Sequence, residues 1–472
     1  MMRSRTAAAW ALAVLLPATT AFDRDPAVAA QATTLATRLQ VPVEYYKLPN
    51  GLKVVLSRDT TTPTVCVAVY YNIGFRNEPK DRTGFAHLFE HMMFQGSGNL
   101  GKMEFIRLIE SNGGLLNGST RFDFTNYYQV TPSHVLEPVL WGEADRMRGL
   151  DIDIENLKNQ QEVVKNEVKV NVLNQPYGSF PLIDMPMTAN ENWYNAHNFY
   201  GDLAHLDAAT LEDVRSFFKT FYAPNNAAVV VTGDFAADQT KAWIQKYFGE
   251  IPAAKLPPPP DLREPRQEKE KRAERTDPLA NRPALGIGYH MPDRLTPEWY
   301  AFGLIDQALA QGDDSLLYDD LARKQGLTGG VDAGINFGLG NMFDYGGPML
   351  WIAQFFHDSS TPSEKLLAAI DGVIEPIRQK GLDQATLDRA RTKLRSNLYA
   401  NLEQFAGFGR ANLLASFALF DDDPSRLNRL EEEFAKVTPE LVKKTADEYL
   451  RPGNRTVYVI KPGKSDVGKG ER

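Results

Sequence analysis

Cysteine is nearly absent from this sequence of 472 residues, in which Cys66 is the only one. The chain can therefore form no disulfide within itself, and a zinc site built from cysteine thiolates is excluded. Cys66 lies in the apolar segment "TVCVAVYY", which predicts a buried strand and a structural role for the thiol.

Basic tracts and long apolar runs are also missing. The net charge is −8 and no cluster of lysine and arginine stands out, so nucleic acid is a poor candidate partner. Beyond the N-terminus no stretch of 18 uncharged apolar residues occurs, so no stable membrane span is expected. Hydrophobic residues make up 43% of the chain, which favours a folded protein over a disordered one.

The N-terminus has the pattern of a secretory signal. Arg3 and Arg5 precede the short apolar segment "TAAAWALAVLLPATTA", and small residues follow in "AVAAQ". This order predicts a signal peptide over residues 1–30, with cleavage near Ala29 or Ala30. The mature protein is then periplasmic or secreted from a bacterium, whereas an uncleaved membrane anchor or a disordered extension is the alternative.

The remaining chain is long enough for two domains of about 200 residues each. Asn50-Gly51 joins two short strand-like runs and predicts a β-hairpin. Strands and helices mix without a regular βαβ alternation, which predicts an α+β fold of two mainly antiparallel sheets flanked by helices. A proline-rich, charged segment over residues 252–279 predicts a linker between domains at 41–251 and 280–463.

The two halves share a sequence pattern near their ends. The segments "TLEDVRSFFKTFYAPNNAAVVV" from Thr210 and "TPELVKKTADEYLRPGNRTVYV" from Thr438 place glutamate, an aromatic residue, proline and asparagine at the same intervals. Each predicts a helix, a turn and a buried strand, so we expect a duplicated domain. Only the first half carries the histidine motif described next.

Two histidines lie four positions apart in "GFAHLFEHMMFQGSGN", residues 84–99. The segment is apolar nearly all round, which predicts a buried helix with His87 and His91 on one face and Glu90 beside them. Burying two imidazoles and a carboxylate without partners is costly, so a bound metal is favoured over a solvated histidine pair. Zinc accepts nitrogen and oxygen ligands, and Glu90 is placed to act as the general base.

A third ligand should come from elsewhere in the chain. The helical segment "NLKNQQEVVKNEVKVNVL" offers Glu162 and Glu167, which lie five residues apart and so point in different directions. One of them could bind the metal, and the residues alone leave the choice open.

These segments resemble the pitrilysin, insulinase and mitochondrial processing peptidase superfamily, whose inverted zinc motif is HxxEH. The resemblance rests on "LPNGLKVVL", "GFAHLFEHMMFQGS", "NGGLLNGSTRFDFTNYY", "NQQEVVKNE" and "YAPNNAAVVVTGDF". It implies one zinc ion per chain, with Glu167 as the third ligand. A glutamate common in the family falls at Gln160, and Glu162 could partly replace it from behind the ligands.

The resemblance also implies how substrates and partners bind. Relatives add the substrate as a strand to a sheet edge, which "LLNGSTRFDFT" matches, so Asn117, Ser119 and Thr120 are candidate substrate contacts. Peptidases of the family hold substrate with an Arg/Tyr pair, but the matching positions here are Ala322 and Gly329. The sequence is thus identified as the zinc-bearing subunit of a dimeric metalloendopeptidase whose homologous partner brings the pair and which encloses peptides in a clamshell. A non-catalytic scaffold subunit is the alternative.

Overall fold

The computed structural model describes residues 40–463; the predicted signal peptide over residues 1–30 lies outside the described residues. The described residues from 41 to 463 belong to one unit. Among the helices between residues 40 and 463, none has the length and apolar character needed to cross a membrane.

The first half builds a six-stranded sheet with the order β1-β2-β6-β3-β5-β4. All neighbours are antiparallel except β2 and β6, which are parallel. The predicted hairpin is confirmed by the pairing of β1 with β2, and Gly51 in its turn has a φ of +89°, which favours glycine. The strands are β1 (Glu44–Lys47), β2 (Lys53–Arg58), β3 (Thr64–Tyr71), β4 (Leu115–Thr120), β5 (Thr125–Pro132) and β6 (Ala227–Gly233).

The second half builds a five-stranded sheet with the order β7-β11-β8-β10-β9. The strands β7 and β11 are parallel, and the other neighbours are antiparallel. This repeats the order and the senses of β2-β6-β3-β5-β4 in the first sheet, so the predicted α+β class with two like halves is confirmed. The strands are β7 (Lys271–Asp277), β8 (Ala284–His290), β9 (Asp332–Ile335), β10 (Leu350–Phe356) and β11 (Arg455–Pro462).

The helices follow the same division. Those of the first half are α2 (Phe85–Met92), α3 (Glu104–Ser111), α4 (Leu136–Arg148), α5 (Ile154–Val168), α6 (Asp184–Ala189), α7 (Trp193–Ala196), α8 (Leu203–Ala208), α9 (Leu211–Phe221) and α10 (Ala237–Phe248). Those of the second half are α11 (Pro297–Leu309), α12 (Ser363–Lys380), α13 (Gln384–Leu402), α14 (Phe408–Asp421), α15 (Leu430–Ala435) and α16 (Pro439–Tyr449). Short helical turns complete the connections, among them η1 (Phe75–Asn77), η3 (Lys169–Leu173) and η5 (Tyr318–Lys324).

Each half has an asparagine that makes the same kind of hydrogen bond. The side-chain amide of Asn226 donates to the carbonyl of Phe221 at the end of α9, at 2.9 Å. The amide of Asn454 donates to the carbonyl of Tyr449 at the end of α16, at 2.7 Å. These are the asparagines of the repeated sequence pattern, so the repeat reflects a hydrogen bond that ties a helix end to the strand that follows it.

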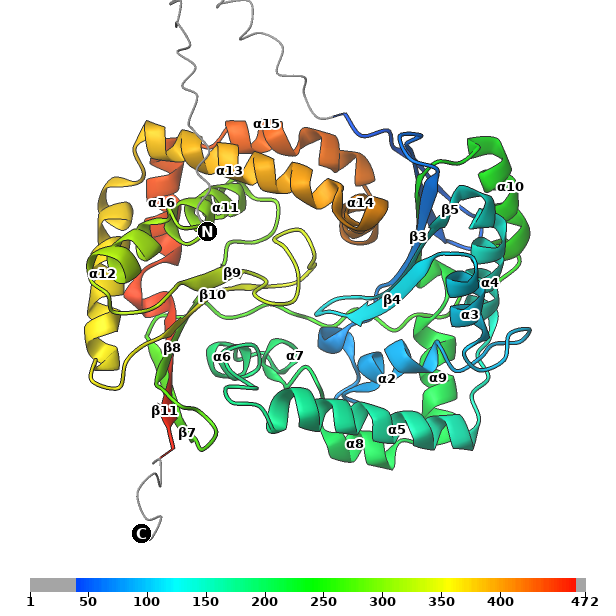
Figure 1. Cartoon of the computed structure of the whole chain (residues 1–472), viewed down its shortest axis with the longest axis horizontal. Helices are drawn as coiled ribbons and strands as arrows, with labels where there is room; N and C mark the ends of the chain where they lie inside the picture. The colour runs from blue at the N-terminus through cyan, green and yellow to red at the C-terminus, as the bar shows by residue number, and fades with distance from the viewer. Residues whose placement is uncertain (1–39, 464–472) are drawn as a thin grey trace, which may run out of the picture. The chain divides into compact units, whose positions relative to one another are not determined.

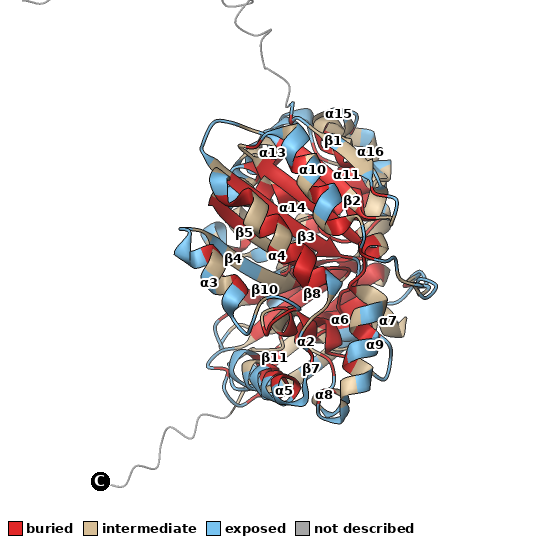
Figure 2. Ribbon diagram, turned by 90° about the vertical axis from the view of Figure 1, so that its right-hand side faces the viewer, coloured by how far each residue is buried: buried red, intermediate tan, exposed pale blue. Residues whose placement is uncertain are grey.

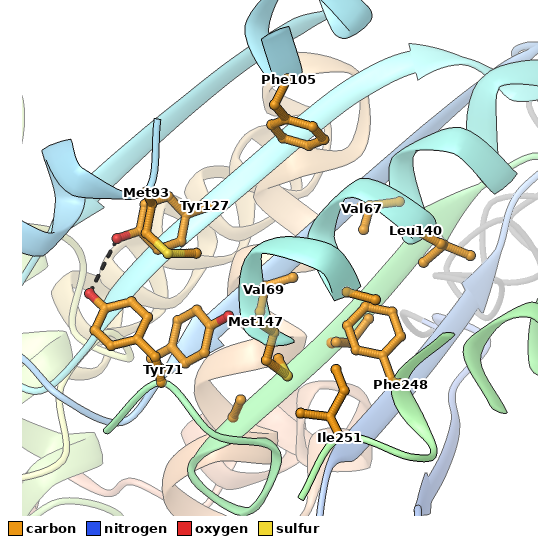
Figure 3. Close-up of a cluster of buried hydrophobic side chains, with 14 of the residues drawn as sticks. Val67, Val69, Tyr71, Met93, Phe105, Tyr127, Leu140, Met147, Phe248 and Ile251 are labelled. Atoms are coloured by element: carbon orange, nitrogen blue, oxygen red, sulfur yellow. Dashed lines mark hydrogen bonds between the residues drawn. The ribbon is translucent and has the colours of Figure 1, made fainter. Parts of the chain in front are cut away.

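The core of the first half lies between its sheet and the helices on one face. Apolar side chains of β3 such as Val67 and Val69 meet Leu140 and Met147 of α4, and Phe248 closes the cluster (Figure 3). Their alternation along the strand places every second residue on this face. The same cluster includes Phe85, Leu88 and Phe89 of α2, which anchors this helix against the sheet.

Each half covers a sheet of the other. The helix α14 of the second half packs on β2, β3 and β6, so β3 lies between α14 and α4 (Figure 1) and both faces of the strand are buried (Figure 2). In return α6 packs on β7, β8 and β11. Gly286 and Gly288 of β8 permit this approach, because a Cβ at Gly288 would meet the Met185 side chain at 3.0 Å.

The segment predicted as a linker needs one correction. Residues 252–270 have no helix or strand, but Lys271–Asp277 form β7, so the linker prediction is wrong for these residues. Every second residue of β7 is exposed, and its side chains are largely charged. The strand is held by backbone hydrogen bonds to β11 rather than by an apolar core, which is why its composition does not reveal it.

Candidate metal centre

The helix α2 places the two predicted histidines. It spans Phe85–Met92, so the helix predicted over residues 84–99 is confirmed for its first part and is wrong for residues 93–99, and α2 is buried on most of its surface. His87 and His91 are one turn apart and project from the same face. Their Nε2 atoms lie 3.3 Å from each other. His87 is buried and His91 is partly exposed, so the pair faces a boundary between the core and solvent.

The third side chain at this point is Glu167 of α5. Its Oε1 lies 3.6 Å from Nε2 of His87, and its Oε2 lies 3.2 Å from Nε2 of His91. Within residues 40–463, these three residues are the one group of three or more potential metal ligands whose ligand atoms lie within 4.8 Å of one another. Hydrogen bonds from the His87 and His91 side chains hold the pKa of Glu167 well below its usual range.

This donor set fits a zinc ion. Two imidazole nitrogens and one carboxylate oxygen are ligands that zinc prefers, at about 2.0–2.1 Å. Ligand atoms at that distance in a tetrahedron lie about 3.3–3.4 Å from one another. The three observed separations, 3.2–3.6 Å, agree with this spacing. The residues therefore fit the metal that the sequence predicts.

Glu162 does not join this group. Its side chain is exposed and pairs with Lys165 of the same helix at 2.5 Å. Since five residues turn an α-helix by about 140°, a helix that presents Glu167 to the histidines turns Glu162 toward solvent. The expectation that Glu162 lies behind the ligands is thus wrong, and Glu162 is a solvent-exposed charged residue of α5. Gln160, at the position of the family's additional glutamate, is buried and donates to Asn159.

Glu90 is held by the edge strand β4. Its Oε2 accepts a hydrogen bond from the Thr120 hydroxyl at 2.7 Å. Gly118 of the same strand lies close to it, since a Cβ there would meet Cγ of Glu90 at 3.3 Å. The Glu90 side chain thus links α2, the helix with the histidines, to the strand predicted to receive substrate.

The strand β4 is the last of its sheet and pairs only with β5. Asn117, Ser119 and Thr120 all lie on it, and of these three predicted substrate contacts Thr120 is the one whose side chain bonds Glu90. The Ser119 hydroxyl donates to Asn126 of β5 at 2.5 Å, and the Gly118 amide donates to the Asn117 side chain at 2.9 Å.

Sequence reasoning missed Tyr200. Its ring centroid lies 5.8 Å from that of His87. Burial raises the pKa of Tyr200, and the nearby charges of Glu167 and Glu90 add to this effect. The sequence assigned no role to any residue of the segment "AHNFYGD", which contains Tyr200. His197 in that segment lies 2.9 and 3.0 Å from the carbonyls of Phe75 and Trp193, away from the ligand group.

The stretch matched to the family's Arg/Tyr pair carries neither residue. Ala322 lies in η5 and Gly329 in the loop before β9. Arg323, one position away, is exposed and bonds Asp319 at 3.2 Å and the carbonyl of Asp313 at 3.0 Å. Its charge is therefore engaged within its own helix and loop.

The second half carries a copy of the metal group in which the ligands are replaced. The helix α11 corresponds to α2, because each lies between the matching strands of its sheet. The segment "HLFEHMMFQG" at residues 87–96 aligns without a gap with "GLIDQALAQG" at 303–312. Gly303 and Gln307 therefore stand at the positions of the two histidines, and Asp306 stands at that of Glu90.

The third ligand has a counterpart as well. The helices α5 and α13 both begin after a capping aspartate, and Asn397 lies as far from its cap as Glu167 does. The amide of Asn397 donates to Oε1 of Gln307 at 3.2 Å, the same separation as between Glu167 and His91. Both line a pocket of about 490 Å³ with Asp306. The separation of these two positions persists, but amides take the place of His91 and Glu167, and Gly303 takes the place of His87.

The protein has two sheets of like topology, and its HxxEH helix lies beside the edge strand of the first. This combination defines the class of folds that carry the inverted zinc motif. The family model "Insulinase (Peptidase family M16)" matches residues 53–192, and "Peptidase M16 inactive domain" matches residues 208–394. The second match contains Gly303 and Gln307. The chain belongs to the insulinase/pitrilysin superfamily, in its two-domain bacterial subgroup.

Similar proteins are named as proteases. "Zinc protease PqqE" of Helicobacter pylori is 26% identical over 424 residues, which are 89% of this chain and 93% of the relative. The crystal structure of a protease from Helicobacter pylori superposes with a TM-score of 0.82 at 25% identity, over 90% of this chain and 100% of that one. The periplasmic protease PqqL from Escherichia coli shares the fold, with a TM-score of 0.72 at 17% identity. The superposed region includes 90% of this chain and 48% of PqqL.

Proposed function

We propose that this protein is a zinc-dependent metalloendopeptidase that hydrolyses peptides or unfolded polypeptides. The observation that carries the proposal is the group of His87, His91 and Glu167, whose ligand atoms lie within 4.8 Å of one another. Relatives named zinc proteases support the same chemistry. One zinc ion per chain is expected, because the matching positions of the second half carry Gly303, Gln307 and Asn397.

Each residue has its own role in the proposed reaction. His87, His91 and Glu167 would hold the metal, and when bound zinc supplies Lewis-acid activation of water and of the scissile carbonyl. Glu90 takes a proton from the attacking water and returns it to the leaving amine. Thr120 donates a hydrogen bond to Oε2 of Glu90 and so restrains the carboxylate. Tyr200 borders His87 and narrows the space around the reacting group.

The substrate would bind in an extended conformation along β4. A strand added to this edge gains main-chain hydrogen bonds, and such bonds do not depend on the substrate's side chains. Asn117, Ser119 and Thr120 lie along the edge and would contact the added strand. Because only an unfolded segment can add as a strand, peptides are favoured over folded proteins.

The protein would act as one subunit of a dimer. Ala322 and Gly329 leave it without the Arg/Tyr pair, which a homologous subunit would bring. This chain superposes on 48% of PqqL, which is about half of that protein. The likeness supports the proposal that this chain needs a second subunit of similar size. PqqL is a periplasmic protease, and together with the predicted signal peptide this favours the periplasm for this chain.

The test is to measure zinc content and peptide hydrolysis on the mature chain, alone and mixed with a homologous subunit that carries the Arg/Tyr pair. Zinc near one per chain, with hydrolysis on mixing, is the expected result. Hydrolysis by the chain alone would refute the dependence on a partner. Absence of both zinc and hydrolysis would refute the enzyme and favour the scaffold subunit.

The variant Glu90→Gln separates binding from chemistry. It should retain zinc, since Glu90 is not one of the three grouped ligands, and it should lose hydrolysis because a neutral amide accepts no proton. Loss of zinc in this variant would mean that Glu90 is a ligand rather than the base.

A further inference from the structure

The helix with the metal group begins without a capping side chain of its own. Its N-cap is Gly84, which has a φ of +86° and no side chain to accept a hydrogen bond. Most helices satisfy their first amide groups with Ser, Thr, Asp or Asn at this position. The first amides of α2 therefore need an acceptor from another part of the chain.

Space explains why no side chain stands at Gly84. A Cβ there would meet the carbonyl oxygen of Tyr200 at 3.1 Å and the Leu206 side chain at 3.2 Å. The next residue of that segment, Gly201, approaches even more closely, since a Cβ on it would meet the Gly84 nitrogen at 2.3 Å. The segment that sets Tyr200 beside His87 thus occupies the place of a normal cap.

Glu78 supplies the missing acceptor. Its Oε2 accepts from the amide of Gly84 at 2.8 Å, and its Oε1 accepts from the amide of Ala86 at 2.6 Å. The carboxyl group is fully buried, and this burial raises the pKa of Glu78 to about 8. Both oxygens of the carboxyl group are therefore used as acceptors for the first amides of α2.

The segment before Glu78 is itself fixed. Nε of Arg76 lies 3.1 Å from Oδ1 of Asp123, and its Nη1 donates to the carbonyl of Pro348 at 2.5 Å. Both charged side chains are buried. Glu78 therefore reaches α2 from a rigid support rather than from a free loop.

The other end of α2 is fixed independently. The Tyr127 hydroxyl donates to the carbonyl of Phe89 at 3.0 Å, and Arg146 donates to the carbonyl of Met93 at 3.2 Å. Only eight residues separate these two ends. A change at the first turn is therefore confined to that turn, which contains Ala86 and leads directly into His87.

We propose that Glu78 is a positioning residue that fixes the first turn of α2 and thereby sets the direction of His87 toward the metal. The inference rests on the proposed zinc site. Glu78 touches neither the ligands nor the substrate edge, so it acts through the backbone of Gly84 and Ala86.

The experiment compares three full-length variants with the wild type. Glu78→Gln keeps the shape but turns one acceptor into a donor, so one of the two amides loses its partner. Glu104→Gln is the matched control, because Oε2 of Glu104 accepts from the Gly101 amide at 2.7 Å at the start of α3, which carries no metal ligand. Glu78→Asp keeps the carboxyl group with a shorter reach. The readouts are zinc affinity by competition with a chromogenic chelator, thermal unfolding of the zinc-free protein, and kcat and KM.

Glu78→Gln should bind zinc about tenfold more weakly, as is typical when a residue that orients a ligand is changed. Its kcat should fall and its KM should stay within about twofold, whereas Glu104→Gln should match the wild type in zinc affinity. Glu78→Asp should lie between Glu78→Gln and the wild type.

Wild-type zinc affinity in Glu78→Gln would overturn the inference, even if that variant melts at a lower temperature. An equal loss in Glu104→Gln would overturn it too, and so would a failure of both Glu78 variants to fold while Glu104→Gln folds, since that shows a role in folding alone. A wild type that binds no zinc would instead refute the proposed function, and this inference with it.

Discussion

The hydroxyl of Thr120 and the carboxylate of Glu90 form a hydrogen bond of 2.7 Å that joins the sheet edge to the helix of the metal group. The donor lies on β4 and the acceptor on α2, so the pair couples the strand that would receive substrate to the group that would transfer the proton. Neither element alone would fix both.

Loss of this hydrogen bond should slow hydrolysis without removing zinc. In Thr120→Val the Glu90 carboxylate loses its orienting partner, and kcat should fall about tenfold, which corresponds to about 1.4 kcal/mol. Thr120→Ser keeps the hydroxyl and should stay close to the wild type. Steady-state kinetics and metal analysis measure both effects, and equal rates in the two variants would contradict the role of the hydroxyl.

The two glutamates of α5 should respond differently to the same substitution. Glu167→Gln removes a proposed ligand and should weaken zinc binding by more than about 100-fold, beyond the effect of changing an orienting residue. Glu162→Gln removes an exposed charge paired with Lys165 and should leave zinc affinity unchanged. Chelator competition on both variants tests this, and a large loss in Glu162→Gln would restore its expected place behind the ligands.

The ion pair between Arg76 and Asp123 should contribute strongly to stability. Both side chains are buried, so Arg76→Met leaves an unpaired carboxylate inside the protein and should cost about 3–5 kcal/mol of unfolding free energy. The double variant Arg76→Met, Asp123→Asn removes the stranded charge and should recover part of this loss. Denaturant unfolding measures both, and a double variant less stable than Arg76→Met would argue against stranded charge as the cause.

Asp306 should make the stability depend on pH. Burial raises the pKa of Asp306 from 3.8 to about 6, so between these values the folded state holds a proton that the unfolded chain has released. The free energy of unfolding should therefore fall as the pH rises through this range, by up to about 1.4 kcal/mol per pH unit, and the effect should be complete above pH 6.

Asp306→Asn is the variant that tests this dependence. The Asp306 Oδ1 accepts from Trp351 at 2.7 Å and from Gln311 at 3.1 Å, and an asparagine oxygen can accept the same two bonds. The variant should lose this part of the pH dependence. Unfolding curves at pH 4, 5, 6 and 7 compare it with the wild type, and unchanged slopes would mean that other groups cause the dependence.

Local patterns were read correctly from the sequence. The helix with His87 and His91, the hairpin at Asn50-Gly51 and the repeated asparagine all follow from periodicity or turn chemistry within a few residues. The choice between Glu162 and Glu167 was different, because helix periodicity says that they diverge but not which one faces the histidines. The family resemblance named Glu167, and the structure brings it to both Nε2 atoms.

Long-range relationships could not be read in the same way. Glu78 bonds α2 from outside the helix, and its role depends on how Tyr200 and Gly201 pack against Gly84, more than 100 residues later in the chain. The strand β7 is charged and half exposed, so its composition predicts a linker. The packing of α14 on the first sheet and of α6 on the second has no local sequence signal. A helix that packs on the sheet of the other half has the same hydrophobic pattern as a helix that packs on the sheet of its own half.

The pair of Gln307 and Asn397 bears on the order in which a metal centre would be assembled. These amides lie 3.2 Å apart, as do His91 and Glu167, although amides attract no zinc. The protein framework alone is therefore sufficient to bring the two helices to this distance. Metal would enter a chain that has already folded, and a chelator should strip the ion while the far-UV circular dichroism of the protein stays the same.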